Sequence, residues 1–346
     1  MKVFHGLQNI GGMAGVLARA QRALGVEAES CCLSTGSFAY KSDRTITASR
    51  GIRRTVEIAS LVARHWKEID VFQFYFGESL SGPRLADVPW LRRLGKKVFF
   101  YFCGCDIRNS KVTIEKYEIS ACRECWPMAC SANRKAAIAT AHRYADGVFV
   151  STPDLLEFVP GGEWLPQPID LHQITAAAAA AGDFAAHGRF TVAHAPSNRM
   201  IKGTAYLEAA VEKLQDKGLP IELMLIENMP YAQALTHCSR ADLVVDQLLV
   251  GSYGQFAVEM MALGKPVICY LRDDVVPHYP ATLPVVNARP DTIADVLERL
   301  YRERDTLSGI GRQGISYART VHDSRVVAAK TLSAYGLPYQ PAASAS

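Results

Sequence analysis

The sequence predicts an α/β protein built from two Rossmann-like lobes with a cleft between them. Short apolar, β-branched runs alternate with amphipathic segments of helical length, which is typical of parallel sheets covered by helices on both faces. The chain has 346 residues, enough for two domains of roughly 150 residues each. Two prolines one residue apart in Leu165–Asp170 exclude helix there, so this segment is the expected linker between the lobes.

The first set of elements starts with a strand that runs into a glycine turn. Ile52–Trp66 has the apolar spacing of a helix, and Val71–Phe76 is aromatic and β-branched like a strand. The other elements expected before the linker are a strand at Val3–Phe4, a helix near Val16–Leu24, a helix at Pro89–Leu94, a strand at Val98–Phe102, a helix at Ala136–Ala145 and a strand at Gly147–Ser151.

After the linker, the alanine run Ala176–Ala181 is either a helix or a low-complexity spacer, and both interpretations stay open. A second alternating set then begins. Its expected strands are Phe190–His194, Ile221–Ile226, Leu243–Asp246 and Pro266–Tyr270, and its expected helices are Thr204–Lys217, Ala232–Cys238, Gln255–Leu263, Thr292–Arg302 and Arg325–Tyr335.

The composition excludes several classes of protein. Apolar residues make up 49% of the chain, so it is not a disordered protein, and a net charge of +4 lacks the dense basic surface of a nucleic-acid binder. The N-terminus does not resemble a signal peptide, and no apolar run reaches the roughly 18 residues of a membrane span. Nine cysteines without an export signal indicate a reducing compartment. We expect a cytoplasmic protein without a nucleic-acid partner, and peripheral contact with an anionic membrane stays open.

A first candidate site follows the strand at Phe190–His194. Ser197, Asn198, Arg199 and Lys202 lie where the chain leaves this strand and enters a helix, which is where open α/β sheets bind ligands. The planar fork of Arg199 and the compact charge of Lys202 both suit a diphosphate. The alternative is a solvated basic pair in a loop.

A second candidate site follows the strand that ends at Asp246. Tyr253, Gly254 and Gln255 precede or open a helix whose free N–H groups can hold phosphate oxygens. Glu259, one turn into that helix, could accept hydrogen bonds from ribose hydroxyls. The alternative is a tight turn followed by an exposed helical carboxylate.

These features together resemble glycosyltransferase family 4. Gly254–Ile268 is similar to that family's donor-site pattern G-x-x-x-x-E-A-M-A-x-G-x-P-V-I, Arg199 with Lys202-Gly203 resembles its phosphate-binding element, and Ala241–Val245 resembles its A-D-x-x-V strand. The resemblance implies the GT-B fold and a retaining glycosyltransferase that needs no cofactor for catalysis. Such an enzyme moves a sugar from a nucleotide-diphosphate donor to a hydroxyl acceptor, a glycan or a lipid-linked glycan, in polysaccharide or glycoconjugate biosynthesis.

The sequence departs from the family pattern at two places in this half. The family has a pair of glutamates separated by seven residues; Glu259 matches the second, but Gly251 stands at the first, which contacts the sugar. Arg199 lies three residues before Lys202, where the family has five. The donor sugar is therefore not implied by the resemblance.

The resemblance also extends to the first half. Gly12 lies in a glycine loop that in the family faces the donor phosphates, and glycine lets the backbone approach a ligand closely. Cys103–Arg108 resembles the family pattern H-G-S-D-x-R and retains Asp106. Asp106, Arg199 and Lys202 form the expected catalytic set, with Asp106 as a helix N-cap the alternative. Met229 and Tyr231, after the strand Ile221–Ile226, are expected to contact the base.

Five cysteines cluster between Cys103 and Cys130. A structural zinc held by Cys105, Cys122, Cys125 and Cys130 would pin a segment that lacks an apolar core. Buried small apolar side chains and an iron–sulfur cluster are the alternatives.

The expected domain organisation follows from these assignments. Residues 1–168 form an acceptor-side domain with a cysteine-rich insertion at 103–133, and residues 169–322 form the donor-binding domain. Residues 323–340 form a helix that packs back on the first domain, and 341–346 are a disordered tail. Two functional alternatives stay open: a nucleotide-sugar epimerase of the same fold and a non-catalytic nucleotide-sugar-binding module.

Overall fold

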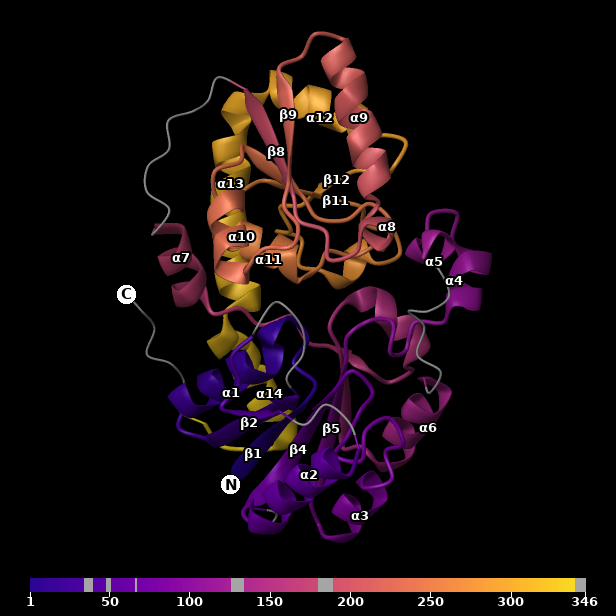
Figure 1. Ribbon diagram of the computed structural model, residues 1–346, viewed down its shortest axis with the longest axis vertical. Coiled ribbons are helices and arrows are strands. Elements are labelled where there is room, and N and C mark those ends of the chain that lie inside the picture. The colour runs from indigo at the N-terminus through magenta and orange to yellow at the C-terminus, as the bar shows by residue number, and fades with distance from the viewer. Residues whose placement is uncertain (34–39, 48–50, 66, 126–133, 180–188, 340–346) are drawn as a thin grey trace. The chain divides into compact units, whose positions relative to one another are not determined.

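The computed structural model of the chain describes residues 1–33, 40–47, 51–65, 67–125, 134–179 and 189–339. The chain forms two compact units. Unit 1 comprises Met1–Asn109, Cys130–Pro168 and Asp323–Ser346, and unit 2 comprises Ser110–Ala129 and Ile169–His322. Each unit has its own parallel sheet, and the two are described separately below (Figure 1).

Unit 1 contains a seven-stranded parallel sheet in the order β3-β2-β1-β4-β5-β6-β7. The strand order reverses between β1 and β4, and the crevice at such a reversal is where doubly wound sheets bind ligands. The strands are β1 (Lys2–Leu7), β2 (Glu27–Leu33), β3 (Arg44–Ile46), β4 (Ile69–Tyr75), β5 (Lys97–Phe102), β6 (Gly147–Val150) and β7 (Glu163–Trp164).

Helices cover both faces of this sheet because successive strand residues point to opposite sides. Val71 packs on the face covered by α1 (Met13–Ala23) and α14 (Ser324–Tyr335), whereas Phe72 packs on the opposite face. Helices α2 (Gly51–His65), α3 (Val88–Arg93) and α6 (Arg134–Tyr144) lie on that second face.

Unit 2 contains a five-stranded parallel sheet in the order β12-β11-β10-β8-β9. Its strand order reverses between β8 and β10. The strands are β8 (Phe190–His194), β9 (Ile221–Leu225), β10 (Leu243–Val245), β11 (Val267–Cys269) and β12 (Val286–Asn287).

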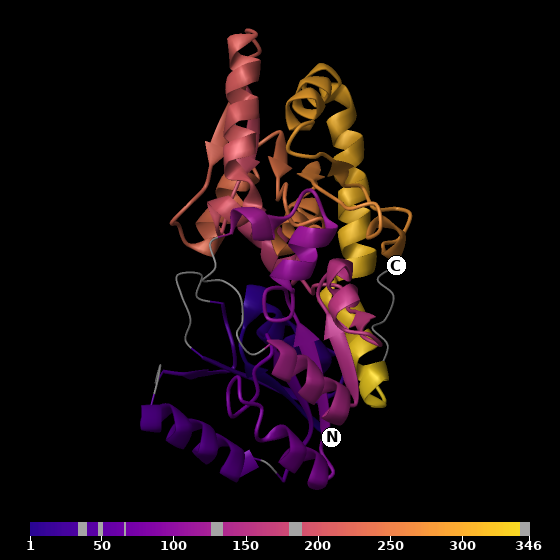
Figure 2. The ribbon, with the colours of Figure 1, turned by 90° about the vertical axis from the view of Figure 1, so that its right-hand side faces the viewer.

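The helices of unit 2 also lie on both faces of its sheet. Helices α9 (Thr204–Asp216) and α12 (Ile293–Arg302) bury their apolar sides together against one face, and Figure 2 shows α9 as a long upright helix. The remaining helices are α4 (Ser110–Lys116), α5 (Ala121–Glu124), α7 (Leu171–Ala179), α8 (Arg199–Lys202), α10 (Tyr231–Cys238), α11 (Gln255–Ala262) and α13 (Leu307–Tyr317).

The division into units differs from the expected domains in one segment. The linker falls at the expected place, between Pro168 and Ile169, and α14 belongs to unit 1. The insertion expected within the first domain is split instead, because residues 110–129 group with unit 2. The alanine run is helical as far as Ala179, while the tail 341–346 lies outside the described residues. Across the described residues, no helix is both long and apolar enough to cross a membrane.

Candidate functional site

The loops after β8 and β10 meet where the strand order of unit 2 reverses. The Lys202 ammonium donates to Asp246 Oδ1 at 2.7 Å and to Gln247 Oε1 at 2.8 Å. The Asp246 carboxylate is fully buried, while the Lys202 side chain keeps 13% of its surface exposed. Because an ammonium has three protons and these two bonds use two, one proton of Lys202 remains for a ligand oxygen.

The start of α11 joins the same group. The Gly254 N–H donates to Asp246 Oδ2 at 2.6 Å, so one carboxylate links the lysine to the first backbone donor of the helix. A side chain at position 254 would lie 3.4 Å from Lys202 Nζ, which confirms how closely the two approach. The structure thus brings Lys202 and Gly254 together around Asp246, a residue that our sequence analysis gave no role.

Arg199 does not join this cluster. Its guanidinium donates to Glu227 at 3.0 Å and forms a second ion pair with Glu208, and its side chain is 44% exposed. Asn198 caps α8 by accepting a hydrogen bond from Ile201 N, and Ser197 is exposed beside it. For Arg199 to reach a phosphate, it would have to leave two carboxylates.

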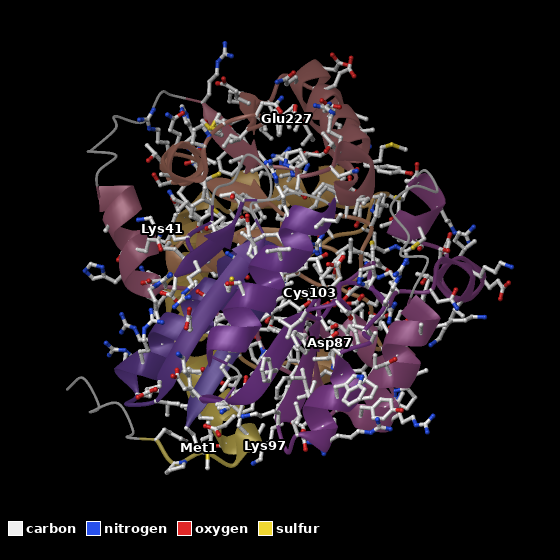
Figure 3. The ribbon with its side chains drawn as sticks, turned by 60° about the horizontal axis from the view of Figure 1, so that its bottom comes forward. Met1, Lys41, Asp87, Lys97, Cys103 and Glu227 are labelled. Carbon is white, nitrogen blue, oxygen red and sulfur yellow. The ribbon has the colours of Figure 1, made fainter. Side chains whose placement is uncertain are left out.

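Glu259 and Tyr231, which were both expected at the donor site, lie in contact with each other. The Tyr231 hydroxyl donates to Glu259 Oε1 at 2.8 Å. Burial raises the pKa of the Glu259 carboxyl to about 7, although hydrogen bonds from Tyr231 and Gln255 oppose the shift. Met229 is half-buried in the loop before α10, which also carries Glu227 (labelled in Figure 3).

The Tyr253 side chain is a core residue and not an exposed ligand contact. It is 1% exposed, and its hydroxyl shares hydrogen bonds with Tyr317 at 3.0 Å and His322 at 2.9 Å. These contacts leave only the backbone of Tyr253 for a ligand. The sequence prediction missed this because a tyrosine beside a glycine loop carries no signal of its burial.

Gly251, which stands where the family has its first glutamate, is enclosed by Arg272. Its φ is +85°, and a Cβ there would lie 2.4 Å from Arg272 Cγ. Arg272 is itself 5% exposed and donates twice to Asp274, at 3.0 Å each. The arginine side chain therefore occupies the space of any larger side chain at 251.

In unit 1, the loop after β1 lies at the reversal of the strand order. Gly12 has a φ of +77°, and a Cβ there would meet the Tyr40 ring at 3.1 Å. Gln8 donates to Glu78 at 2.8 Å, from the loop after β4. Asn9, 8% exposed, has no hydrogen-bond partner for its amide within the described part of the chain. A buried unsatisfied amide at this position makes Asn9 a candidate ligand contact that our sequence analysis missed.

Asp106 organises the loop after β5, where Cys103 is labelled in Figure 3. Its carboxylate accepts from Cys103 N at 3.1 Å and from Gly104 N at 2.6 Å, and it is buried. Burial raises its pKa to about 6, although these backbone bonds lower it. Because these donors precede Asp106 and the next helix begins only at Ser110, the carboxylate closes the turn after β5 and is not the N-cap of a helix.

The proposed zinc ligands are not brought together where they are described. Cys105 belongs to unit 1, whereas Cys122 and Cys125 belong to α5 and its C-cap in unit 2. Cys130 lies outside the described residues. Within the described ranges, no three histidine, cysteine or acidic side chains are grouped so that they could hold a metal ion. A zinc site remains a prediction that depends on Cys130.

No family model matches the chain, and no curated protein matches it in sequence. Solved structures do match it along nearly its whole length. HepE from Anabaena in complex with UDP and glucose has a TM-score of 0.65 at 14% identity, covering 97% of this chain and 99% of that chain. Sucrose-phosphate synthase from Thermosynechococcus elongatus has a TM-score of 0.62 at 16% identity, covering 97% and 98%. The chain has the GT-B fold.

The GT-B fold is not confined to transferases among the matching structures. UDP-GlcNAc 2-epimerase from Neisseria meningitidis, bound to UDP-GlcNAc, has a TM-score of 0.55 at 16% identity and covers 96% of this chain and 100% of that chain. At these identities the likeness establishes the fold, and the function must come from the site.

Proposed function

We propose that the chain is a nucleotide-sugar glycosyltransferase whose unit 2 binds the donor diphosphate. The observation that supports this proposal most directly is the cluster of Lys202, Asp246 and the N-terminus of α11. This cluster lies where the strand order of the unit 2 sheet reverses. A lysine with a proton to donate and the start of a helix are both suited to phosphate oxygens. The HepE structure that shares this fold holds UDP and glucose.

Each group would have a distinct part in transfer. Lys202 would stabilise the charge that develops on the departing diphosphate, and Asp246 would keep its ammonium in place. Tyr231 and Glu259 would bind the nucleoside part, where the carboxylate accepts ribose hydroxyls. The acceptor hydroxyl, from a glycan or lipid-linked glycan, would bind in unit 1 near Asn9. Retention of configuration, work in polysaccharide or glycoconjugate biosynthesis, and catalysis without a metal are parts of this proposal that rest on the family resemblance.

The nucleotide-sugar epimerase is the second candidate, because a UDP-GlcNAc 2-epimerase shares the fold. An epimerase needs an acid and a base beside the sugar carbon that is inverted. Asp106 is enclosed by backbone N–H groups and Glu259 is bonded to Tyr231, so neither geometry favours that role over transfer.

Calorimetry with UDP, GDP and ADP tests the donor site directly. We expect one of the three to bind wild-type protein, and Lys202→Met to weaken that binding by about ten- to a hundredfold, the usual worth of a hydrogen bond to a charged group. Lys217→Met, which breaks an exposed ion pair with Glu298 in the same unit, should leave affinity unchanged. Lys202→Met leaves the buried Asp246 carboxylate without its charge partner, which can itself destabilise the protein. The double variant Lys202→Met/Asp246→Asn removes that buried charge and serves as the stability control. Wild-type affinity in Lys202→Met would contradict the proposal.

A product assay with a panel of nucleotide sugars separates the three functions. Release of nucleoside diphosphate that depends on an added glycan or lipid acceptor supports transfer. Interconversion of the sugar without release supports an epimerase, and tight binding with neither outcome supports a non-catalytic module.

We also propose that the protein works in the cytoplasm and touches a membrane surface through α2. Ile52 and Val56, one turn apart on this helix, are 83% and 59% exposed. They line an open groove together with Arg54 and Arg84, and Arg53 is exposed beside them. Figure 2 shows α2 as the violet helix at the lower edge of unit 1. Exposed aliphatic side chains flanked by arginines complement an anionic lipid surface.

A further inference from the structure

The chain between residues 110 and 125, which we name the strap, packs on the donor side of unit 2. It comprises α4 and α5, and it follows directly on the Asp106 loop of unit 1. Figure 1 shows α5 beside α8, the short helix that carries Lys202, and α4 beside α5. Two of its contacts reach the loop 246–254, which we name the ligand loop, one directly and one through Arg272.

The first contact holds the middle of the ligand loop. The Ala121 N–H donates to the Leu249 carbonyl at 2.8 Å, and the Leu249 side chain is buried. On its other side the loop is tied to α8, because Leu248 N donates to the Lys202 carbonyl at 3.0 Å. A Cβ at Gly203 would lie 3.1 Å from Leu248 and 3.2 Å from Leu249, so the two segments are in direct contact. The ligand loop is thus held between the strap and the lysine-bearing helix.

The second contact supports the end of the loop through Arg272. The Arg272 guanidinium lies 3.7 Å from the centroid of the Tyr117 ring, a cation–π geometry. The Tyr117 hydroxyl donates to Asp274 Oδ2 at 3.2 Å, and the same carboxylate accepts from Arg272. The aliphatic part of the Arg272 side chain lies against Gly251, and the backbone N–H of Arg272 donates to the Gly251 carbonyl at 3.0 Å. Tyr117 therefore fixes the side chain against which the loop turns.

The strap is itself held in shape by its own hydrogen bonds. The Ser120 side chain caps α5 by accepting from Cys122 N, and the Arg123 side chain donates to the carbonyls of Ile114 and Tyr117. Its outer contacts are weaker: Glu124 accepts from the Tyr206 hydroxyl at 3.0 Å, and the ion pair of Glu118 with Arg289 is exposed. The two inner contacts, of Ala121 with Leu249 and of Tyr117 with Arg272, are the ones that can hold the ligand loop in one conformation.

We propose that the strap preorganises the ligand loop for the diphosphate, with Tyr117 as a positioning residue that never touches the donor. The inference rests on the proposed function, because the loop is assigned to the diphosphate. Its physical basis is entropy: a loop that is already fixed loses less conformational freedom when ligand binds. Loss of Tyr117 removes the ring that packs on the Arg272 guanidinium, and so weakens the support of the turn at Gly251 that leads to Gly254.

The test compares Tyr117→Ala with Tyr117→Phe by calorimetry with UDP, GDP and ADP and by hydrogen exchange of the amides in 248–252. Tyr117→Ala is expected to lower the affinity for the nucleotide that binds by about tenfold, since it removes a desolvated cation–π contact. It should speed hydrogen exchange of the loop amides by a similar factor. Tyr117→Phe keeps the ring and is expected to stay within about twofold of wild type. Tyr206→Phe, which loses only the outer contact with Glu124, serves as the matched control.

The outcomes separate this inference from the proposed function. Wild-type affinity and unchanged loop exchange in Tyr117→Ala would overturn the inference. If wild-type protein binds none of the three nucleotides, the proposed function fails, and the exchange of the 248–252 amides still decides whether the strap orders the loop. Should Tyr117→Ala fail to fold, Tyr117→Leu removes the ring while filling its space, and the same two measurements apply.

Discussion

The surroundings of Gly251 favour glycine over any residue with a side chain. Its φ of +85° favours glycine, and a Cβ would meet Arg272 Cγ at 2.4 Å. We expect Gly251→Ala to lower the free energy of unfolding by about 2 to 4 kcal/mol, combining the cost of overpacking and of the backbone. Gly218→Ala is the control, because Gly218 has a φ of +83° with nothing within 4 Å. Urea denaturation that gave equal losses for the two variants would contradict the clash with Arg272.

We expect Glu259 to make the stability of unit 2 depend on pH. Burial raises its pKa from an ordinary value of 4.5 to about 7. Between these values the folded state binds a proton that the unfolded state lacks, so the free energy of unfolding falls as pH rises. The total loss should be about 3 kcal/mol, complete above pH 7, and Glu259→Gln should abolish it. Urea denaturation from pH 4.5 to 8 measures both proteins, and an unchanged slope in the variant would exclude Glu259 as the cause.

At the residue scale, sequence patterns predicted which loops of unit 2 lie together, but not the contacts inside them. The structure places Lys202 beside Gly254, and Tyr231 beside Glu259. That these groups bind a donor stays a prediction. The partner of Lys202 was missed, although Asp246 directly follows a buried strand and that position is itself a signal for a ligand site. The contacts of Tyr253 could not be predicted from the local sequence. Its hydrogen-bond partners, Tyr317 and His322, lie 64 and 69 positions further along the chain.

Helix α14 secures unit 1 from the far end of the chain. The Tyr335 side chain is fully buried, its ring lies 4.6 Å from that of Phe99, and its hydroxyl donates to Gln73. We expect Tyr335→Ala to lower the stability of unit 1 by about 3 to 5 kcal/mol, the usual cost of truncating a buried aromatic side chain. Hydrogen exchange should then quicken in α1 and β5 and stay unchanged in β8 and β10. Ser333→Ala, exposed on the same helix, is the control; equal exchange in both variants would contradict this role for α14.

The elements that sequence reasoning found are those with strong apolar periodicity, such as α2, β4 and β5. Strand β2 was missed because Glu27, Glu29 and Ser30 interrupt its apolar residues. Its charges are paired across strands: Glu29 meets Lys2 of β1 at 3.3 Å and also pairs with Arg44 of β3. Cross-strand pairs of this kind stabilise a sheet but depend on strand order, which local sequence does not contain.

At the scale of the whole chain, the two-set alternation and the proline linker were sufficient to predict two Rossmann-like lobes, and the family resemblance implied the GT-B fold. They could not predict that residues 110–129 leave unit 1 for unit 2, since that depends on contacts such as Ala121 with Leu249. The structural zinc expected in this segment stays a prediction, because Cys130 lies outside the described residues. Chain order alone therefore defines the units only approximately, because the chain passes between them after Asn109, Ala129, Pro168 and His322.

The proposed membrane contact of α2 can be tested with lipid vesicles. Sedimentation with phosphatidylcholine vesicles, with and without phosphatidylglycerol, should show binding only to the anionic vesicles, and added salt should weaken it. Arg53→Gln/Arg84→Gln should lower the partition coefficient about fivefold for each charge removed. Ile52→Ser/Val56→Ser should lower it as well, whereas Val276→Ser, an exposed apolar residue of unit 2, should not. Equal binding by all variants would mean that a surface other than α2 meets the lipid.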